Sequence, residues 1–65
     1  MPPSQPIVRV LIVEDDLDDM VLFKSLFKES KRVAAVITAA NTYAEGMALL
    51  TSGQFFDVVL LDYKL

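Results

Sequence analysis

The chain has 65 residues, a formal net charge of −3 and a hydrophobic fraction of 54%, and it contains no cysteine and no histidine. This composition favours one small packed domain and excludes disulfides, thiolate or imidazole metal ligands and a histidine base. The negative charge argues against nucleic-acid binding by this segment. No apolar stretch approaches the ~20 residues of a membrane-spanning helix and no secretory signal is evident, so we expect a cytoplasmic protein without a membrane partner.

The N-terminal part of the chain predicts a lead-in followed by a strand. Residues 1–6 contain three prolines, which fix φ and lack an amide donor, so this segment is expected to be extended or disordered. Residues 7–13 are rich in β-branched side chains, and only Arg9 interrupts the apolar run. Such a run is typical of a strand covered on both faces. The folded domain is therefore expected to span residues 7–65.

An acidic turn follows this strand and leads into a predicted helix. Five of the nine acidic residues of the chain lie between Glu14 and Asp19. Asp16 or Asp18 is expected to cap a helix over residues 17–30, because a short acid accepts hydrogen bonds from free backbone amides. The apolar stripe expected to face the core has these members: Met20, Phe23 and Phe27, with Leu22 and Leu26 beside them.

The middle of the chain predicts a second strand and a second helix. Residues 33–39 form the expected strand. Thr42 and Glu45 match a capping box, with Thr42 as N-cap and the Glu45 side chain bonding back, and the helix runs to about residue 51. Gly46 within this helix costs about 1 kcal/mol relative to alanine. One face of this helix is expected to carry three apolar side chains, Tyr43, Met47 and Leu50.

The last stretch, residues 56–65, contains four apolar residues, 58–61, that run directly into Asp62. This pattern predicts a third strand, buried on both faces, with a carboxylate at its carboxyl end. The resulting order of strand, helix, strand, helix and strand predicts the α/β class, built from βαβ units around a parallel sheet.

Two strands thus each end in acidic residues. Neighbouring strands lie about 4.8 Å apart, so adjacent first and third strands would bring Glu14, Asp15 and Asp62 into one cleft. Like charges this close disfavour full ionisation unless a cation compensates them, and Mg²⁺ suits such oxygen ligands. One carboxylate could instead serve as a nucleophile. The alternatives are that Asp62 only caps a turn and that the acidic run is a solvated face.

Three stretches carry a resemblance to a known family: residues 10–16 (Val-Leu-Ile-Val-Glu-Asp-Asp), residues 42–50, and residues 57–65 (Asp-Val-Val-Leu-Leu-Asp-Tyr-Lys-Leu). The chain resembles the receiver domain of two-component response regulators, and the first and last stretches are specific as a pair. The resemblance implies a flavodoxin-like, doubly wound parallel sheet of strand order 2-1-3-4-5, of which this chain would form the N-terminal βαβαβ half. It also implies a phosphoacceptor signalling module that is not itself an enzyme, with a histidine kinase or phosphotransfer protein as partner.

The resemblance assigns roles to individual residues. Asp62 matches the phosphoacceptor, Asp15 the direct Mg²⁺ ligand and Glu14 the second acid, which often acts through water. Lys64 matches the position whose backbone carbonyl completes the metal site. The family's Ser or Thr after the fourth strand and its lysine after the fifth strand are absent from these 65 residues. We therefore expect an N-terminal receiver fragment.

Two other functions stay open at this point. The first is a non-phosphorylated interaction or dimerisation module, because the absent groups help bind the phosphoryl group. The edge of the third strand would then allow self-association or completion by a partner segment. The second is a phosphatase of the haloacid-dehalogenase type. This function is disfavoured, because those enzymes carry an aspartate two residues after the nucleophile, where this chain has Lys64.

Overall fold

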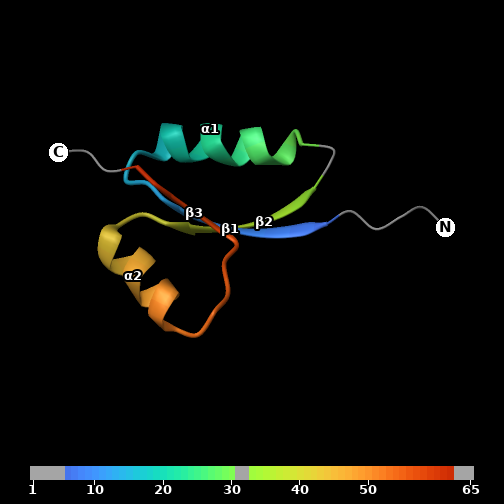
Figure 1. Cartoon of the computed structure of the whole chain (residues 1–65). Helices are drawn as coiled ribbons and strands as arrows, with labels where there is room; N and C mark the ends of the chain where they lie inside the picture. The colour runs from blue at the N-terminus through green and yellow to red at the C-terminus, as the bar shows by residue number, and fades with distance from the viewer. Residues whose placement is uncertain (1–5, 31–32, 63–65) are drawn as a thin grey trace.

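The computed structural model describes residues 6–30 and 33–62 and confirms the predicted alternation of strands and helices. The elements are β1 (Ile7–Val13), α1 (Leu17–Lys28), β2 (Ala34–Ala40), α2 (Tyr43–Thr51) and β3 (Val58–Leu61) (Figure 1). Compared with the predictions, β2 lies one residue later and α1 ends two residues earlier. The predictions for residues 1–5 and for Lys64 lie outside the described residues. Neither described helix is long and apolar enough to cross a membrane.

The three strands are parallel and follow the order β2-β1-β3, which confirms that the first and third strands are neighbours. β1 pairs with β2 along its whole length, from Ile7 opposite Ala34 to Val13 opposite Ala40. It pairs with β3 over its second half, where Val13 lies opposite Leu61. The last residues of all three strands are therefore in register at one edge of the sheet.

The core forms two layers, one on each face of β1. Figure 1 shows α1 on one side of the sheet and α2 on the other. Because successive strand residues point to opposite faces, Val10 and Ile12 pack with Met20 of α1, whereas Leu11 and Val13 pack on the other side. Both faces of β1 are thus buried, which explains its nearly continuous apolar sequence.

The prediction that β3 is buried on both faces is wrong. Val58, Val59 and Leu61 are 37%, 43% and 51% exposed. The reason is that β3 is an edge strand with β1 as its only partner in the described sheet, and the helices pack against β1 and β2. Within α1, likewise, the expected stripe packs on the core at Met20, Phe23 and Phe27, whereas Leu22 and Leu26 are exposed.

The helix α2 does not pack on the sheet through the face that carries its three apolar side chains. Tyr43, Met47 and Leu50 are exposed, and buried Gly46 lies against Val13 of β1 instead. A Cβ at position 46 would lie 2.6 Å from Val13 Cγ2, so glycine lets the helix approach the strand this closely. The helix ends at Thr51, as predicted, and Gly53 with φ +87° lies directly after the C-cap Ser52.

Candidate acidic site at the carboxyl edge of the sheet

Backbone hydrogen bonds hold the two acidic strand ends together. The N–H of Glu14, directly after β1, donates to the carbonyl oxygen of Ala40 at 3.0 Å. The N–H of Asp62, directly after β3, donates to the carbonyl oxygen of Val13 at 3.1 Å. Each acid is therefore tied to the neighbouring strand at the same edge, and the predicted convergence of Glu14 and Asp62 is present in the structure.

Glu14 is the buried acid of this edge, with only 1% of its surface exposed. Its Oε1 accepts a hydrogen bond from the backbone N–H of Asp16 at 2.9 Å. Its Oε2 is buried and has no hydrogen-bond partner among the described residues. A buried oxygen without a partner is costly, so this atom marks a position where a cation or a proton would be stabilising.

The surroundings of Glu14 favour its protonated form. The neighbouring carboxyl of Asp62 is the main cause that raises the pKa of Glu14 above its ordinary value. The Asp16 N–H acts in the opposite direction, and burial and the carboxyl of Asp15 raise the pKa further. The protonation of Glu14 thus depends on the neighbouring acids of this edge.

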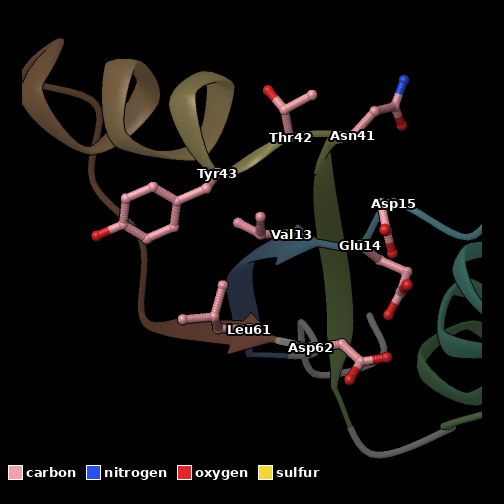
Figure 2. Close-up of a pocket in the computed structure, with 8 residues that line it drawn as sticks. All are labelled: Val13, Glu14, Asp15, Asn41, Thr42, Tyr43, Leu61 and Asp62. Atoms are coloured by element: carbon pink, nitrogen blue, oxygen red, sulfur yellow. The ribbon is translucent and has the colours of Figure 1, made fainter. Parts of the chain in front are cut away.

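A cavity of about 160 Å³ opens beside these acids. Figure 2 shows the side chains that line it: Val13, Glu14, Asp15, Asn41, Thr42, Tyr43, Leu61 and Asp62. The three predicted site acids in the described part of the chain all belong to this lining. The cavity therefore has acidic groups from two strand ends and a further wall from the start of α2.

The wall at the start of α2 is held by side-chain caps. Thr42 Oγ1 accepts from the N–H of Glu45 at 3.1 Å, which confirms Thr42 as the N-cap. Glu45 Oε2 accepts a hydrogen bond from the N–H of Asn41 at 2.9 Å. In a regular capping box the donor would be the N–H of the N-cap itself, Thr42. The predicted capping box is thus shifted at its second bond, and both bonds fix residues that border the cavity.

The first turn of α1 brings a further acid to this edge. Asp16 is the N-cap, and its Oδ1 accepts from the N–H groups of Asp18 at 2.8 Å and Asp19 at 3.2 Å. The sequence left the cap open between Asp16 and Asp18, and the structure decides for Asp16. This cap fixes the turn that carries Asp19, which is half-buried.

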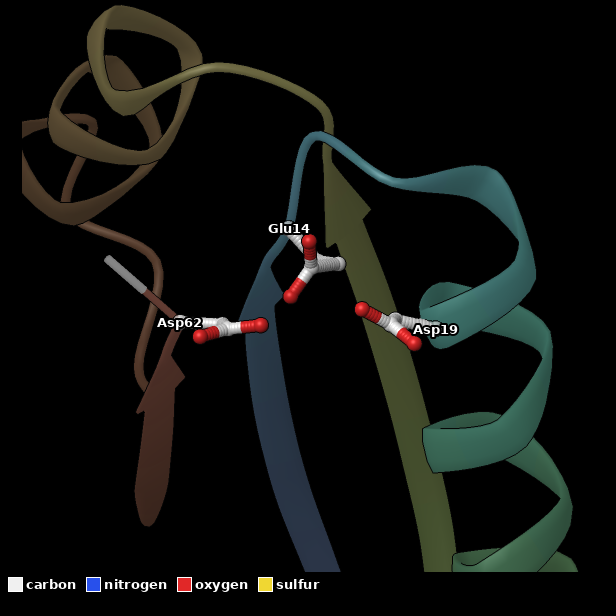
Figure 3. A group of neighbouring side chains, drawn as sticks. All are labelled: Glu14, Asp19 and Asp62. Atoms are coloured by element: carbon white, nitrogen blue, oxygen red, sulfur yellow. The ribbon is translucent and has the colours of Figure 1, made fainter. Parts of the chain in front are cut away.

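The structure groups Asp19 with Glu14 and Asp62, whereas the sequence pattern did not indicate Asp19 as a site residue. One carboxylate oxygen from each of these three residues lies within 4.8 Å of the other two (Figure 3). The available signal was the position of Asp19 three residues after the N-cap, where a side chain reaches back toward the helix start. Asp15 borders the cavity but is exposed and is not part of this compact group.

This arrangement of carboxylates is chemically suited to a hard divalent cation, which prefers oxygen ligands. Comparisons of the chain with protein-family models, with curated proteins and with solved structures each found no match. The receiver-domain resemblance therefore stays a hypothesis based on the residues of this chain.

Proposed function

We propose that this chain is a phosphoacceptor receiver module of two-component signalling, in which Asp62 accepts a phosphoryl group. The donor would be the phosphohistidine of a kinase or phosphotransfer protein. The observation that supports this proposal most is the buried Glu14 Oε2, which has no hydrogen-bond partner among the described residues. In addition, the neighbouring Asp62 raises the pKa of the Glu14 carboxyl. A cation beside Glu14 would stabilise this site, and it would lie next to Asp62, where the phosphoryl group would be transferred.

The strand order supports a flavodoxin-like fold for the module. The order β2-β1-β3 agrees with the first three strands of a 2-1-3-4-5 sheet. In such sheets, ligands bind outside the carboxyl ends of the strands at the switch point between β1 and β3. Glu14 and Asp62 lie at this position.

The proposed reaction is a transfer between two nucleophiles. A carboxylate oxygen of Asp62 attacks the phosphorus atom, and the new P–O bond forms as the P–N bond of the phosphohistidine breaks. The electron pair of the P–N bond stays on the released nitrogen, the other ring nitrogen carries the proton, and the histidine side chain leaves as neutral imidazole. Asp62 is exposed, so a partner's phosphohistidine can reach it. It also lines the cavity beside Glu14 and Asp15.

The residues of this edge fit Mg²⁺, which when bound would neutralise the charge of the phosphoryl group in transfer. Glu14, Asp15 and Asp62 supply carboxylates around one cavity, and the Glu14 Oε2 provides the unpartnered oxygen. The carbonyl of Lys64, the fourth ligand implied by the resemblance, lies outside the described residues.

The test is labelling with acetyl phosphate in the presence of Mg²⁺, followed by intact-protein mass spectrometry. We expect the wild-type chain to gain one phosphoryl group that hydroxylamine removes, as it does from acyl phosphates. Asp62→Asn should abolish the gain. Asp57→Asn is the matched control at the other end of β3, because asparagine can still accept the 2.8 Å bond from the Arg9 N–H. Labelling that persists in Asp62→Asn refutes the assignment.

The exposure of β3 favours a second candidate, a non-phosphorylated interaction module that self-associates. The edge of β3 that faces away from β1 has no partner strand among the described residues, and three of the strand's apolar side chains, Val58, Val59 and Leu61, are exposed. The occupant would be β3 of a second copy. Sedimentation should then show dimers that Val59→Lys disrupts and that Val21→Lys, at an exposed position of α1, leaves intact. A wild-type monomer at high concentration contradicts this function.

A further inference from the structure

We propose that Asp19 supplies a further carboxylate, beside those of Glu14 and Asp62, to the site of one divalent cation. The receiver resemblance assigns no role to Asp19, so this residue extends the metal site implied there. The inference rests on the proposed function for the identity of the cation, Mg²⁺. Its own basis is the geometry of three side chains from three different segments (Figure 3).

The spacing of the three oxygens suits a single ion. Ligands on opposite sides of an octahedral Mg²⁺ lie about 4.1 Å apart, because each bond is about 2.0–2.1 Å long. The oxygens of Glu14, Asp19 and Asp62 all lie within 4.8 Å of one another. Small side-chain rotations would therefore bring one oxygen of each residue into contact with the same ion.

The charge at this position is uncompensated in the described part of the chain. Glu14 is 1% exposed, and its Oε2 has no hydrogen-bond partner there. No described lysine or arginine forms an ion pair with the three acids. An acidic cluster alone is common at protein surfaces. In this cluster, however, a buried carboxylate oxygen has no hydrogen-bond partner, and a cation at this position would stabilise it.

The first turn of α1 provides a matched pair of acids for a test. The N–H groups of Asp18 and Asp19 both bond to Asp16 Oδ1, and both carboxylates lie in the first turn, where they interact favourably with the helix dipole. Only Asp19 belongs to the group with Glu14 and Asp62, whereas Asp18 is exposed. Replacing either residue with asparagine removes one charge from the same turn.

The experiment is calorimetric titration of Mg²⁺ into the full chain and into the variants Asp19→Asn and Asp18→Asn. We expect Asp19→Asn to weaken Mg²⁺ binding about tenfold or more, the effect of removing a metal-site carboxylate or its direct partner. Asp18→Asn should weaken it only about twofold, because a solvent-exposed charge is screened. Equal effects of the two variants would overturn the proposal and leave Asp19 with a helix-dipole role alone.

A second measurement keeps folding effects apart from metal binding. In EDTA, Asp19→Asn should unfold at a higher temperature than Asp18→Asn, because only Asp19 is repelled by Glu14 and Asp62 in the absence of the ion. A lower unfolding temperature for Asp19→Asn would assign a structural role and overturn the proposal. So would a wild-type chain that binds no Mg²⁺. The proposed function is decided separately, by whether Asp62→Asn abolishes phosphoryl labelling.

Discussion

Replacing Gly46 with alanine tests how closely α2 approaches β1. Two effects oppose each other. Alanine is the better helix former by about 1 kcal/mol. Its Cβ, however, would lie 2.6 Å from Val13 Cγ2, whereas non-bonded carbon atoms prefer about 3.5–4.0 Å. Val13 is buried, and its branched side chain has little rotational freedom, so the helix itself would have to move.

The expected net effect is a loss of stability. Overpacking of this kind typically costs about 1–3 kcal/mol. After the gain in helix propensity is subtracted, Gly46→Ala should lower the free energy of unfolding by about 1 kcal/mol. The distances from the same Cβ to Val13 Cγ1 and Cβ, 3.5 and 3.6 Å, are ordinary contacts, so a single methyl group causes the clash.

Urea unfolding followed by far-ultraviolet circular dichroism can separate the two effects. In a Val13→Ala background the clashing methyl is gone, so Gly46→Ala should there stabilise the chain by about 1 kcal/mol. Ala48→Gly, at an exposed position of the same helix, is the propensity control and should cost about 1 kcal/mol. The reasoning is refuted if Gly46→Ala stabilises the wild-type chain as much as it stabilises Val13→Ala.

Two further predictions concern the cavity. Thr42→Ala removes the N-cap hydrogen bond from the Glu45 N–H, so it should lower the free energy of unfolding, measured by urea unfolding, by about 1 kcal/mol. Thr42→Ser keeps a hydroxyl at the N-cap and should retain most of the wild-type stability. The second prediction is a pH dependence measured in EDTA. Because the pKa of Glu14 in the folded chain is raised above 4.5, its contribution to stability is present at lower pH and is lost as the pH rises through the folded-state pKa. Glu14→Gln should therefore gain stability relative to the wild type with rising pH, and parallel pH curves for the two proteins would contradict this.

Much of the fold follows from local patterns in the sequence. The β-branched run of β1, the N-cap Thr42 and the terminating Gly53 each act within a few residues, so their effects can be predicted without knowledge of distant contacts. The convergence of Glu14 and Asp62 was also predictable, because parallel strands end at a common edge and each of these acids directly follows a strand.

Other features depend on which elements become neighbours in space. An apolar strand has the same sequence pattern in the centre of a sheet and at its edge, so only the order β2-β1-β3 shows that Leu61 is exposed. Gly46 was expected only to weaken a helix, but the close packing of α2 on Val13 makes it necessary. The role of Asp19 likewise depends on how α1 lies over the sheet. One acid among five in a short run becomes a candidate ligand because packing brings its carboxylate to Glu14 and Asp62.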